Sequence, residues 1–465
     1  MMRRFVFPLA ATLAALTYLA ASIWSQPPEH KRSSVRAEPF RSTDGQVIGW
    51  RIAIPGGKPL ATPAVVDGRI YVGGGFGSHE FYALDASTGN PLWTYRTADD
   101  GPTAAVTYGS DIIFNTESCE LEIITRDGKP RWKKWLGDPL MSMPAVSDGV
   151  VYMAYPNSRG DQRYYLAAFD LDTGRELWKR PISSEIITAP VIEEKRVYVA
   201  TVDGSLFSFD RRDGAQVFQE AKNATSAPAV WNGQCYFSRR EQSTVIANGR
   251  QAQQQNEIFA ARSVAPAAPI KDMEPTRQKA DYLDYDKRKV SHAEVASQAM
   301  DSSVGFGGSK GSANVHAMRS NLGQASVHGV WEYQGSKSFV DQGMLFSSMG
   351  AKVMSVDPKT DKVVWTRTLN DGKEILNSEL TPPAIVNGKV FVGTRTGEVM
   401  ALSEKTGEVI WKVKIGEPVV FQPAVVLGHV YVSTASGTIF CLNTGDPRDD
   451  GWSMWGGTAA HNGKR

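Results

Sequence analysis

The sequence predicts an all-β fold, a β-propeller of about eight four-stranded antiparallel blades. Three observations predict it: a unit of about forty residues recurs, runs of alternating apolar residues are separated by Asp-Gly, Asn-Gly or Thr-Gly turns, and a tryptophan returns at one offset from the Thr-Gly turn. A four-stranded sheet of this size cannot bury both faces alone, whereas sheets stacked around an axis cover one another.

The first half of the unit is complete in TPAVVDGRIYVG, from Thr62 to Gly73. It contains a proline or small residue, an apolar pair, a glycine turn and an aromatic-rich run, which is typical of two short strands joined by a tight turn. Related copies begin at Ser142, Thr188, Ser226, Thr381 and Phe421, and degenerate copies begin near Thr103 and Lys337. These first halves predict the number of blades.

The second half of the unit is ALDASTGNPLW, from Ala83 to Trp93. Its glycine permits a tight reversal of the chain, and its tryptophan can pack a broad ring between adjacent blades. The tryptophans expected in this structural role are Trp50, Trp93, Trp132, Trp178, Trp365 and Trp411.

The two halves are offset at the chain ends. A second-half copy, Phe40 to Trp50, precedes every first half, while the first half that begins at Phe421 is followed only by TIFCLNTGD. We therefore expect the strand Gln46–Ile52 to pair with Thr438–Asn443, so that the N-terminal strand closes the ring and leaves no open edge. The propeller should span residues 40–451.

The N-terminus predicts export. Arg3 and Arg4 precede an apolar run from Phe5 to Trp24, so residues 1–25 are either a cleaved signal peptide or a membrane anchor. Residues 26–39 form a linker. We expect the protein in the periplasm or cell envelope, with membrane contact only through a possible N-terminal anchor. The formal charge of +2 excludes nucleic acid as an expected partner.

Two segments depart from the repeat. Residues 264–326 are rich in Ala, Gln, Ser and charge and have few large apolar groups, so we expect a flexible insertion within the fifth blade, with Val327–Tyr333 as the outer strand of that blade. The insertion is either passive or folds on a partner. Residues 452–465 form a tail, whose Trp452 and Trp455 should dock on the propeller.

Candidate ligand-binding residues lie in the loops that enter each blade and that join its middle strands, because a rigid scaffold presents such loops. The second repeat is the most unusual: Asn115, Glu117 and Cys119 share one face by alternation, and Asp138 follows in the next connection. Alternatively, Glu117 is a solvated turn residue and Cys119 fills the core. Further candidates are His79, which is also typical of a surface loop, Glu379 and Arg395.

The pattern AxDxxTGxxxW, intact at Ala83–Trp93 and Ala168–Trp178, resembles the repeat of the pyrroloquinoline-quinone-type propeller superfamily. That superfamily includes quinoprotein alcohol dehydrogenases and exported propellers without catalysis, such as the outer-membrane assembly propeller. The resemblance implies that a quinone enzyme would hold pyrroloquinoline quinone under adjacent cysteines, beside calcium and a catalytic aspartate. The cysteines here are Cys119, Cys235 and Cys441, which are far apart in the chain.

No HExxH motif and no phosphate-binding glycine loop occurs in the sequence, so no catalytic or metal-ligating residue is expected. The sequence therefore predicts a non-catalytic module that binds or scaffolds an envelope protein partner, without a cofactor. The alternative is a quinoprotein-type oxidoreductase, or a small-ligand-binding propeller, that uses the central funnel with pyrroloquinoline quinone and calcium.

Overall fold

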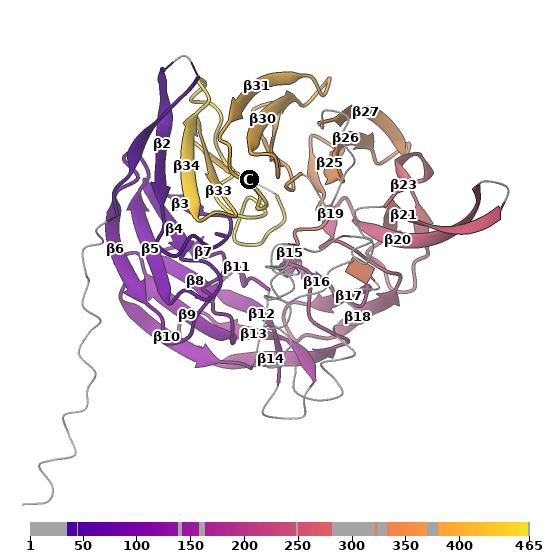
Figure 1. Cartoon of the computed structure of the whole chain (residues 1–465). Coiled ribbons are helices and arrows are strands. Elements are labelled where there is room, and N and C mark those ends of the chain that lie inside the picture. The colour runs from indigo at the N-terminus through magenta and orange to yellow at the C-terminus, as the bar shows by residue number, and fades with distance from the viewer. Residues whose placement is uncertain are drawn as a thin grey trace, which may run out of the picture.

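Eight antiparallel β-sheets surround a central axis in the computed structural model of the chain (Figure 1). The structure describes residues 35–43, 45–137, 142–157, 163–247, 250–280, 321–322, 333–369 and 380–463. The first strands of successive sheets contact one another around the axis, and the last strands form the rim. The protein is thus an eight-bladed β-propeller, as predicted. No helix within the described ranges is long and apolar enough to cross a membrane.

The first four blades follow one another in chain order, each running outward from the axis. The first two contain β3 (Ala64–Val66), β4 (Arg69–Gly73), β5 (Glu80–Asp85) and β6 (Pro91–Arg96), then β7 (Val106–Tyr108), β8 (Asp111–Asn115), β9 (Glu120–Thr125) and β10 (Pro130–Trp135). The third and fourth contain β11 (Ala145–Ser147), β12 (Val150–Pro156), β13 (Tyr164–Asp170) and β14 (Glu176–Ile182), then β15 (Val191–Glu193), β16 (Arg196–Ala200), β17 (Ser205–Asp210) and β18 (Gln216–Ala221).

The remaining blades continue the circle. The fifth contains β19 (Ala229–Trp231), β20 (Gln234–Ala247), β21 (Arg250–Ser263), β22 (Ile270–Asp272) and β23 (Gln278–Lys279), with the short 3₁₀ turn η1 (Glu274–Thr276). The sixth and seventh contain β24 (Phe339–Asp341), β25 (Met344–Met349), β26 (Lys352–Asp357) and β27 (Lys362–Thr368), then β28 (Ala384–Val386), β29 (Lys389–Gly393), β30 (Glu398–Ser403) and β31 (Val409–Lys414). The eighth contains β32 (Ala424–Val426), β33 (His429–Ser433), β34 (Thr438–Asn443), β2 (Val47–Ala53) and β1 (Glu38–Arg41).

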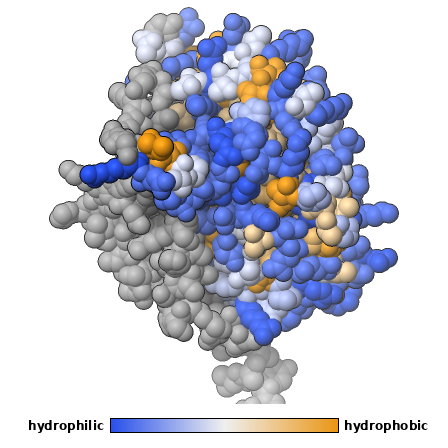
Figure 2. Space-filling view, turned by 90° about the vertical axis from the view of Figure 1, so that its right-hand side faces the viewer, coloured by the Kyte–Doolittle hydropathy of each residue, from blue (hydrophilic) through white to orange (hydrophobic). Residues whose placement is uncertain are grey.

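The residue pattern within a blade follows its position between two neighbours. The second strand is buried on both faces, as in β8, where all five residues are buried, whereas the rim strand β27 alternates between exposed and half-buried residues. The turn between β3 and β4 consists of Asp67 and Gly68, whose φ angles of 49° and 72° give the left-handed turn that an Asp-Gly pair favours. One rim face is mainly hydrophilic, with scattered apolar residues (Figure 2).

The eighth blade combines strands from both ends of the described chain. β2 pairs with β34 from Gly49 opposite Leu442 to Ala53 opposite Thr438, so the pairing predicted between these two segments is present. Gly49 is required for this approach, because a Cβ atom there would lie 1.8 Å from the carbonyl oxygen of Cys441.

The repeated tryptophans join adjacent blades. In five of the six, the indole nitrogen donates a hydrogen bond to a backbone carbonyl oxygen in the following blade, at 2.7 to 3.2 Å, and the ring covers the glycine of that blade's Thr-Gly-type turn. The donor and acceptor pairs are Trp50 and Ala86, Trp93 and Arg126, Trp132 and Leu171, Trp178 and Arg211, and Trp365 and Glu404. In the seventh blade, Trp411 lies at the edge of the Phe391 ring, with centroids 6.4 Å apart.

The fifth blade differs from the prediction. Its outer position beside β21 is occupied by β22, which pairs with β21 at Ala260–Arg262, and by β23. The predicted outer strand Val327–Tyr333 lies, except for Tyr333, outside the described residues. The sheet therefore continues to Lys279, within the range predicted as a flexible insertion. Residues 281–320 and 323–332 lie outside the described residues.

Candidate functional site

The two ends of the axis are built from different segments. In every antiparallel blade, the connection from the preceding blade and the turn between the second and third strands lie at one end, which we call the connecting face. The turns between the first and second strands lie at the other end, which we call the turn face. Of the candidates predicted from the sequence, His79, Glu117 and Arg395 lie in turns at the connecting face.

The structure brings two of those candidates near each other. His79 lies in the turn between β4 and β5 of the first blade, and Glu117 lies in the turn between β8 and β9 of the second. The connection between the blades joins them, because the Glu117 amide donates to the carbonyl oxygen of Asp100 at 2.8 Å, and the His79 charge acts on the Asp100 carboxyl. Arg395 occupies the corresponding turn of the seventh blade. Asp138 and Glu379 lie outside the described residues.

Asn115 and Cys119 are buried. The Thr103 hydroxyl donates to Asn115 Oδ1 at 2.6 Å, and the Thr103 amide donates to the Asn115 carbonyl oxygen at 2.8 Å, so Asn115 fastens the entering chain to β8. Burial raises the pKa of the Cys119 thiol well above its ordinary value, which keeps it protonated and a poor nucleophile. These contacts favour structural roles for both side chains.

Sequence reasoning missed two acidic residues in the same connection, Asp99 and Asp100. Asp99 Oδ2 accepts hydrogen bonds from the Thr116 hydroxyl and, at 2.8 Å, from the Ser118 amide, so it orders the turn that carries Glu117. Burial raises the pKa of Asp100, and the Asp99 charge adds to that increase, while His79 opposes it. The repeat gave no signal for these residues, because inter-blade connections vary in length and composition.

Glu185 is a third acidic residue that the sequence analysis missed. It lies in the connection between β14 and β15, is 3% exposed, and has its pKa raised to about 8 by burial. Its charge also raises the pKa of Cys119, after burial and Asp99. Among the side chains that the structure describes, no three His, Cys, Asp or Glu form a group that could hold a metal ion.

At the turn face, the C-terminal segment crosses the axis. Trp452 and Trp455 are each 1% exposed, which confirms that both dock on the propeller. Backbone hydrogen bonds of 2.7 to 3.0 Å join this segment to the innermost strands of four blades. The bonded pairs are Trp452 with Val425, Ser453 with Val65, Ala459 with Val146 and Ala460 with Ile192.

His461 anchors the end of this segment. Its Nδ1 lies 2.7 Å from the carbonyl oxygen of Trp455 and its Nε2 lies 2.9 Å from that of Pro144. Burial lowers the pKa of His461 to about 4, although both carbonyl oxygens act in the opposite direction. Trp455 Nε1 in turn donates to Gln334 Oε1 at 2.5 Å, which connects the segment to the chain entering the sixth blade.

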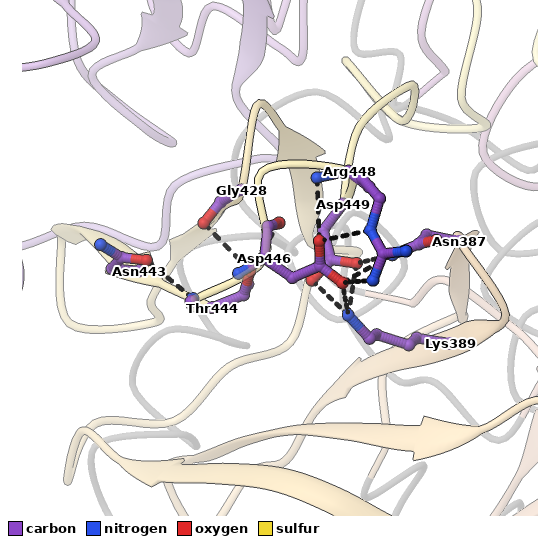
Figure 3. A network of polar contacts seen from close by, with 9 residues as sticks. Asn387, Lys389, Gly428, Asn443, Thr444, Asp446, Arg448 and Asp449 are labelled. Carbon is purple, nitrogen blue, oxygen red and sulfur yellow. Dashed lines mark hydrogen bonds and ion pairs between the residues drawn. The ribbon is translucent and has the colours of Figure 1, made fainter.

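A charged network holds the start of the C-terminal segment against the seventh blade (Figure 3). Lys389 Nζ donates to both carboxylate oxygens of Asp449, at 2.6 and 2.8 Å, and to Asp446 Oδ2 at 3.0 Å. Asn387 also donates to Asp449 Oδ1, at 2.7 Å. Arg448 and then Lys389 lower the pKa of Asp446. The Asp449 side chain is fully buried, so this network fixes the turn that directs the segment into the axis.

Together, the fold and the axis define a β-propeller whose own C-terminal segment occupies the turn face, while variable connections form the other face. The chain belongs to the family whose model is described as outer membrane protein assembly factor BamB, which matches residues 24–121, 120–255 and 339–456.

Curated relatives fall into two groups. The chain is 21% identical over 282 residues to the outer membrane protein assembly factor BamB of Burkholderia pseudomallei, covering 49% of this chain and 72% of that protein. It is 28% identical over 197 residues to BamB of Shewanella oneidensis, covering 39% and 48%. A quinoprotein ethanol dehydrogenase of Pseudomonas aeruginosa is 34% identical over 138 residues, covering 25% of this chain and 22% of the enzyme. The chain thus spans about half of the second relative and a smaller share of the enzyme.

Solved structures of both groups share the fold. BamB from Moraxella catarrhalis superposes with a TM-score of 0.53 at 13% identity, covering 84% of this chain and 98% of that chain. The quinohemoprotein alcohol dehydrogenase of Comamonas testosteroni gives 0.53 at 14% identity, covering 86% and 76%. The cysteines of this chain do not fit a quinone site of adjacent cysteines, because Cys119, Cys235 and Cys441 are buried separately in the second, fifth and eighth blades.

Proposed function

We propose that this protein is an exported, non-catalytic propeller that binds another protein at the cell envelope. The family match over three long segments carries the proposal, because the relatives it describes are named as assembly factors of the outer membrane. A protein component of outer-membrane assembly is therefore the proposed partner. Residues 1–25 direct export in this proposal, either as a cleaved signal or as an anchor.

The connecting face is the proposed binding surface. The C-terminal segment occupies the turn face through backbone hydrogen bonds to four blades, which leaves the connections as the loops presented around the axis. His79, Asp100 and Glu117 lie together there on the first two blades, and hydrogen bonds to Asp99 and Asp100 order the turn that carries Glu117. Such ordering supports binding by a preformed surface.

A quinoprotein-type oxidoreductase is the second candidate, and the 34% identity to a quinoprotein ethanol dehydrogenase over 138 residues favours it. The separate cysteines count against quinone binding, so we propose that no cofactor is required. We expect no dye-linked alcohol or sugar dehydrogenase activity after addition of pyrroloquinoline quinone and calcium. Turnover that is lost in both Glu117→Gln and Asp138→Asn, with the fold retained, would replace the scaffold proposal by an enzyme.

Site-specific photo-crosslinking in native envelopes tests the binding proposal. A photoreactive residue at the exposed Ala98, in the connection between the first two blades, should crosslink a specific envelope protein. The matched control is the exposed Ser87, in the same blade but in the β5–β6 turn at the turn face. Crosslinks from Ser87 without crosslinks from Ala98 would move the binding surface to the turn face, and crosslinks from neither position would overturn the proposal.

A further inference from the structure

Among the strands that the structure describes, the two that form a hairpin in the fifth blade are the longest. β20 and β21 pair over fourteen residues each, and their far ends project beyond the rim of the propeller (Figure 1). β19 covers β20 only at Gln234–Tyr236, followed by a bridge from Ala224 to Arg239 and a 2.8 Å hydrogen bond from the Arg240 amide to the Asn223 carbonyl oxygen. Beyond Arg240, no described residue pairs with this edge of β20.

The free edge presents regular backbone donors and acceptors. Since the Arg240 amide points away from β21, alternation along an antiparallel strand directs the N–H and C=O groups of Gln242, Thr244 and Ile246 the same way. The exposed side chains of these residues share one face of the hairpin, and Ile246 is 80% exposed. Another extended strand is the partner that such an edge fits.

The features that normally prevent edge pairing are missing. From Gln242 to Asn256 the only charged residue in the sequence is Arg250, and the stretch contains no proline. The hairpin is also ordered by its own side chains: Gln253 Nε2 donates to the Thr244 hydroxyl at 3.2 Å, and Asn256 Nδ2 donates to the Ser243 hydroxyl at 2.7 Å. The edge is therefore preformed as well as unprotected.

The other edge of the hairpin is partly covered. β23 pairs with β21 at Asn256 and Glu257, and the Ala280 amide continues that pairing with a 2.9 Å hydrogen bond to the Gln255 carbonyl oxygen. The chain itself thus begins to occupy the β21 edge. Because β23 already covers part of the β21 edge, the β20 edge is the one available for pairing with another molecule.

We propose that the β20 edge pairs antiparallel with the same edge of a second copy of this chain, so that the fifth blades of two propellers form one continuous sheet. Two copies of an uncharged edge can approach each other without charge repulsion. A two-fold axis at Thr244 places this residue opposite Thr244 of the second copy, and a Thr–Thr pair across two strands is favourable. The projection of the hairpin keeps the two propellers apart while the edges meet (Figure 1). The inference is independent of the proposed function.

The surrounding surface sets the expected strength. The described part of the rim face in Figure 2, which lies on the hairpin side, is mainly hydrophilic and shows only scattered apolar residues, without a broad apolar area for face-to-face association. Association therefore rests on a few backbone hydrogen bonds, and we expect a reversible dimer with a dissociation constant on the order of 10–100 µM.

Sedimentation equilibrium of the full chain, with detergent present, tests the dimer. Thr244→Lys and Thr244→Glu each place like charges opposite one another, so each variant alone should weaken association at least about tenfold, and an equimolar mixture should restore it. The matched control is Gln251→Lys, an exposed position on β21 opposite Ile246, which lies one strand away from the β20 edge and should dimerise like wild type.

A proline variant gives a second, charge-independent measurement. Thr244→Pro removes an outward N–H group and leaves the hydrogen bonds between β20 and β21 in place, so it should also weaken the dimer. The proposal is overturned if wild type stays monomeric up to about 0.5 mM, well above the expected dissociation constant. It is also overturned if the dimer persists in the single Thr244 variants, or if the Lys and Glu mixture fails to associate while both variants remain folded.

Discussion

The indole nitrogen of Trp178 in the third blade donates a 2.9 Å hydrogen bond to the carbonyl oxygen of Arg211 in the fourth. The Arg211 side chain in turn contacts the third blade, because its Nη2 donates a 2.7 Å hydrogen bond to Asp148 Oδ2. The ring of Trp178 also covers Gly214, where a Cβ atom would lie 2.6 Å from the ring. The contacts of Trp178 thus explain why the repeat has a tryptophan at this position and a glycine at the position of Gly214.

Truncation of Trp178 should therefore weaken the packing between the third and fourth blades. We expect Trp178→Ala to lower the free energy of unfolding by roughly 3–5 kcal/mol, because it removes a buried aromatic ring and its hydrogen bond. Urea denaturation followed by tryptophan fluorescence and circular dichroism measures the change. The neighbouring Leu177, 38% exposed on the rim, is the control, and Leu177→Ala should cost less than about 1 kcal/mol. Equal effects of the two substitutions would contradict packing of the ring between blades.

The cost of substituting Gly214 should depend on the presence of the Trp178 ring. Its φ is 69°, so Gly214→Ala costs about 1–2 kcal/mol from backbone conformation alone, and more because the new methyl group meets the ring. We expect the excess to vanish when Trp178→Ala is also present, which a double-mutant cycle measures.

Gly109→Ala is the matched control for the Gly214 prediction. Gly109 has a φ of 58° and no atom within 4 Å of a built Cβ atom, so it reports conformational strain without a clash. Additive effects at Gly214 and Trp178 would show that the ring does not require the glycine.

The sequence predicted the ring of blades because each blade repeats one set of contacts. The offset between Gly and Trp is fixed by a single inter-blade contact, and the mismatch of repeat halves at the chain ends predicted the pairing of β2 with β34. The sequence analysis did not identify β22, because this strand is only three residues long, Ile-Lys-Asp, and has neither the turn nor the tryptophan of the repeat.

The candidate site was less predictable from the sequence. Alternation along β8 identified Asn115, but its burial and its bond to Thr103 depend on how the chain enters the blade. Asp100 and Glu185 were missed since they lie in inter-blade connections, and their burial depends on the folded structure. The inter-blade connections have no repeating residue pattern, so the sequence does not predict which residues of another blade lie next to them.

Loss of Asp449 should release the C-terminal segment. In Asp449→Ala, Lys389 keeps only Asp446 as a carboxylate partner in the network of Figure 3, and we expect docking of residues 452–463 to weaken by about 2–4 kcal/mol. Hydrogen exchange of the Trp452 and Ala459 amide region measures this. Arg448→Ala is the control, because that side chain is 79% exposed and should leave exchange nearly unchanged. Unchanged protection in Asp449→Ala would contradict a role for the network in docking.

Glu185 should make the protein less stable as the pH rises. Burial raises its folded-state pKa from an ordinary 4.5 to about 8, so between these values the unfolded chain releases a proton that the folded protein retains. The contribution of Glu185 is therefore fully present below pH 4.5 and is lost as the pH rises through 8, by up to about 1.4 kcal/mol per pH unit. Glu185→Gln cannot ionise, so its advantage over wild type should grow across this window.

Urea denaturation at pH 5, 6.5 and 8 measures this difference, with each midpoint converted to a free energy of unfolding. The control is Glu194→Gln, at an exposed position just before β16, which should keep the pH dependence of wild type. A free-energy difference between Glu185→Gln and wild type that stays constant from pH 5 to 8 would mean that Glu185 ionises in the folded protein. In that case the Glu185 carboxylate would be solvated in the folded protein, and water would reach the connection between β14 and β15.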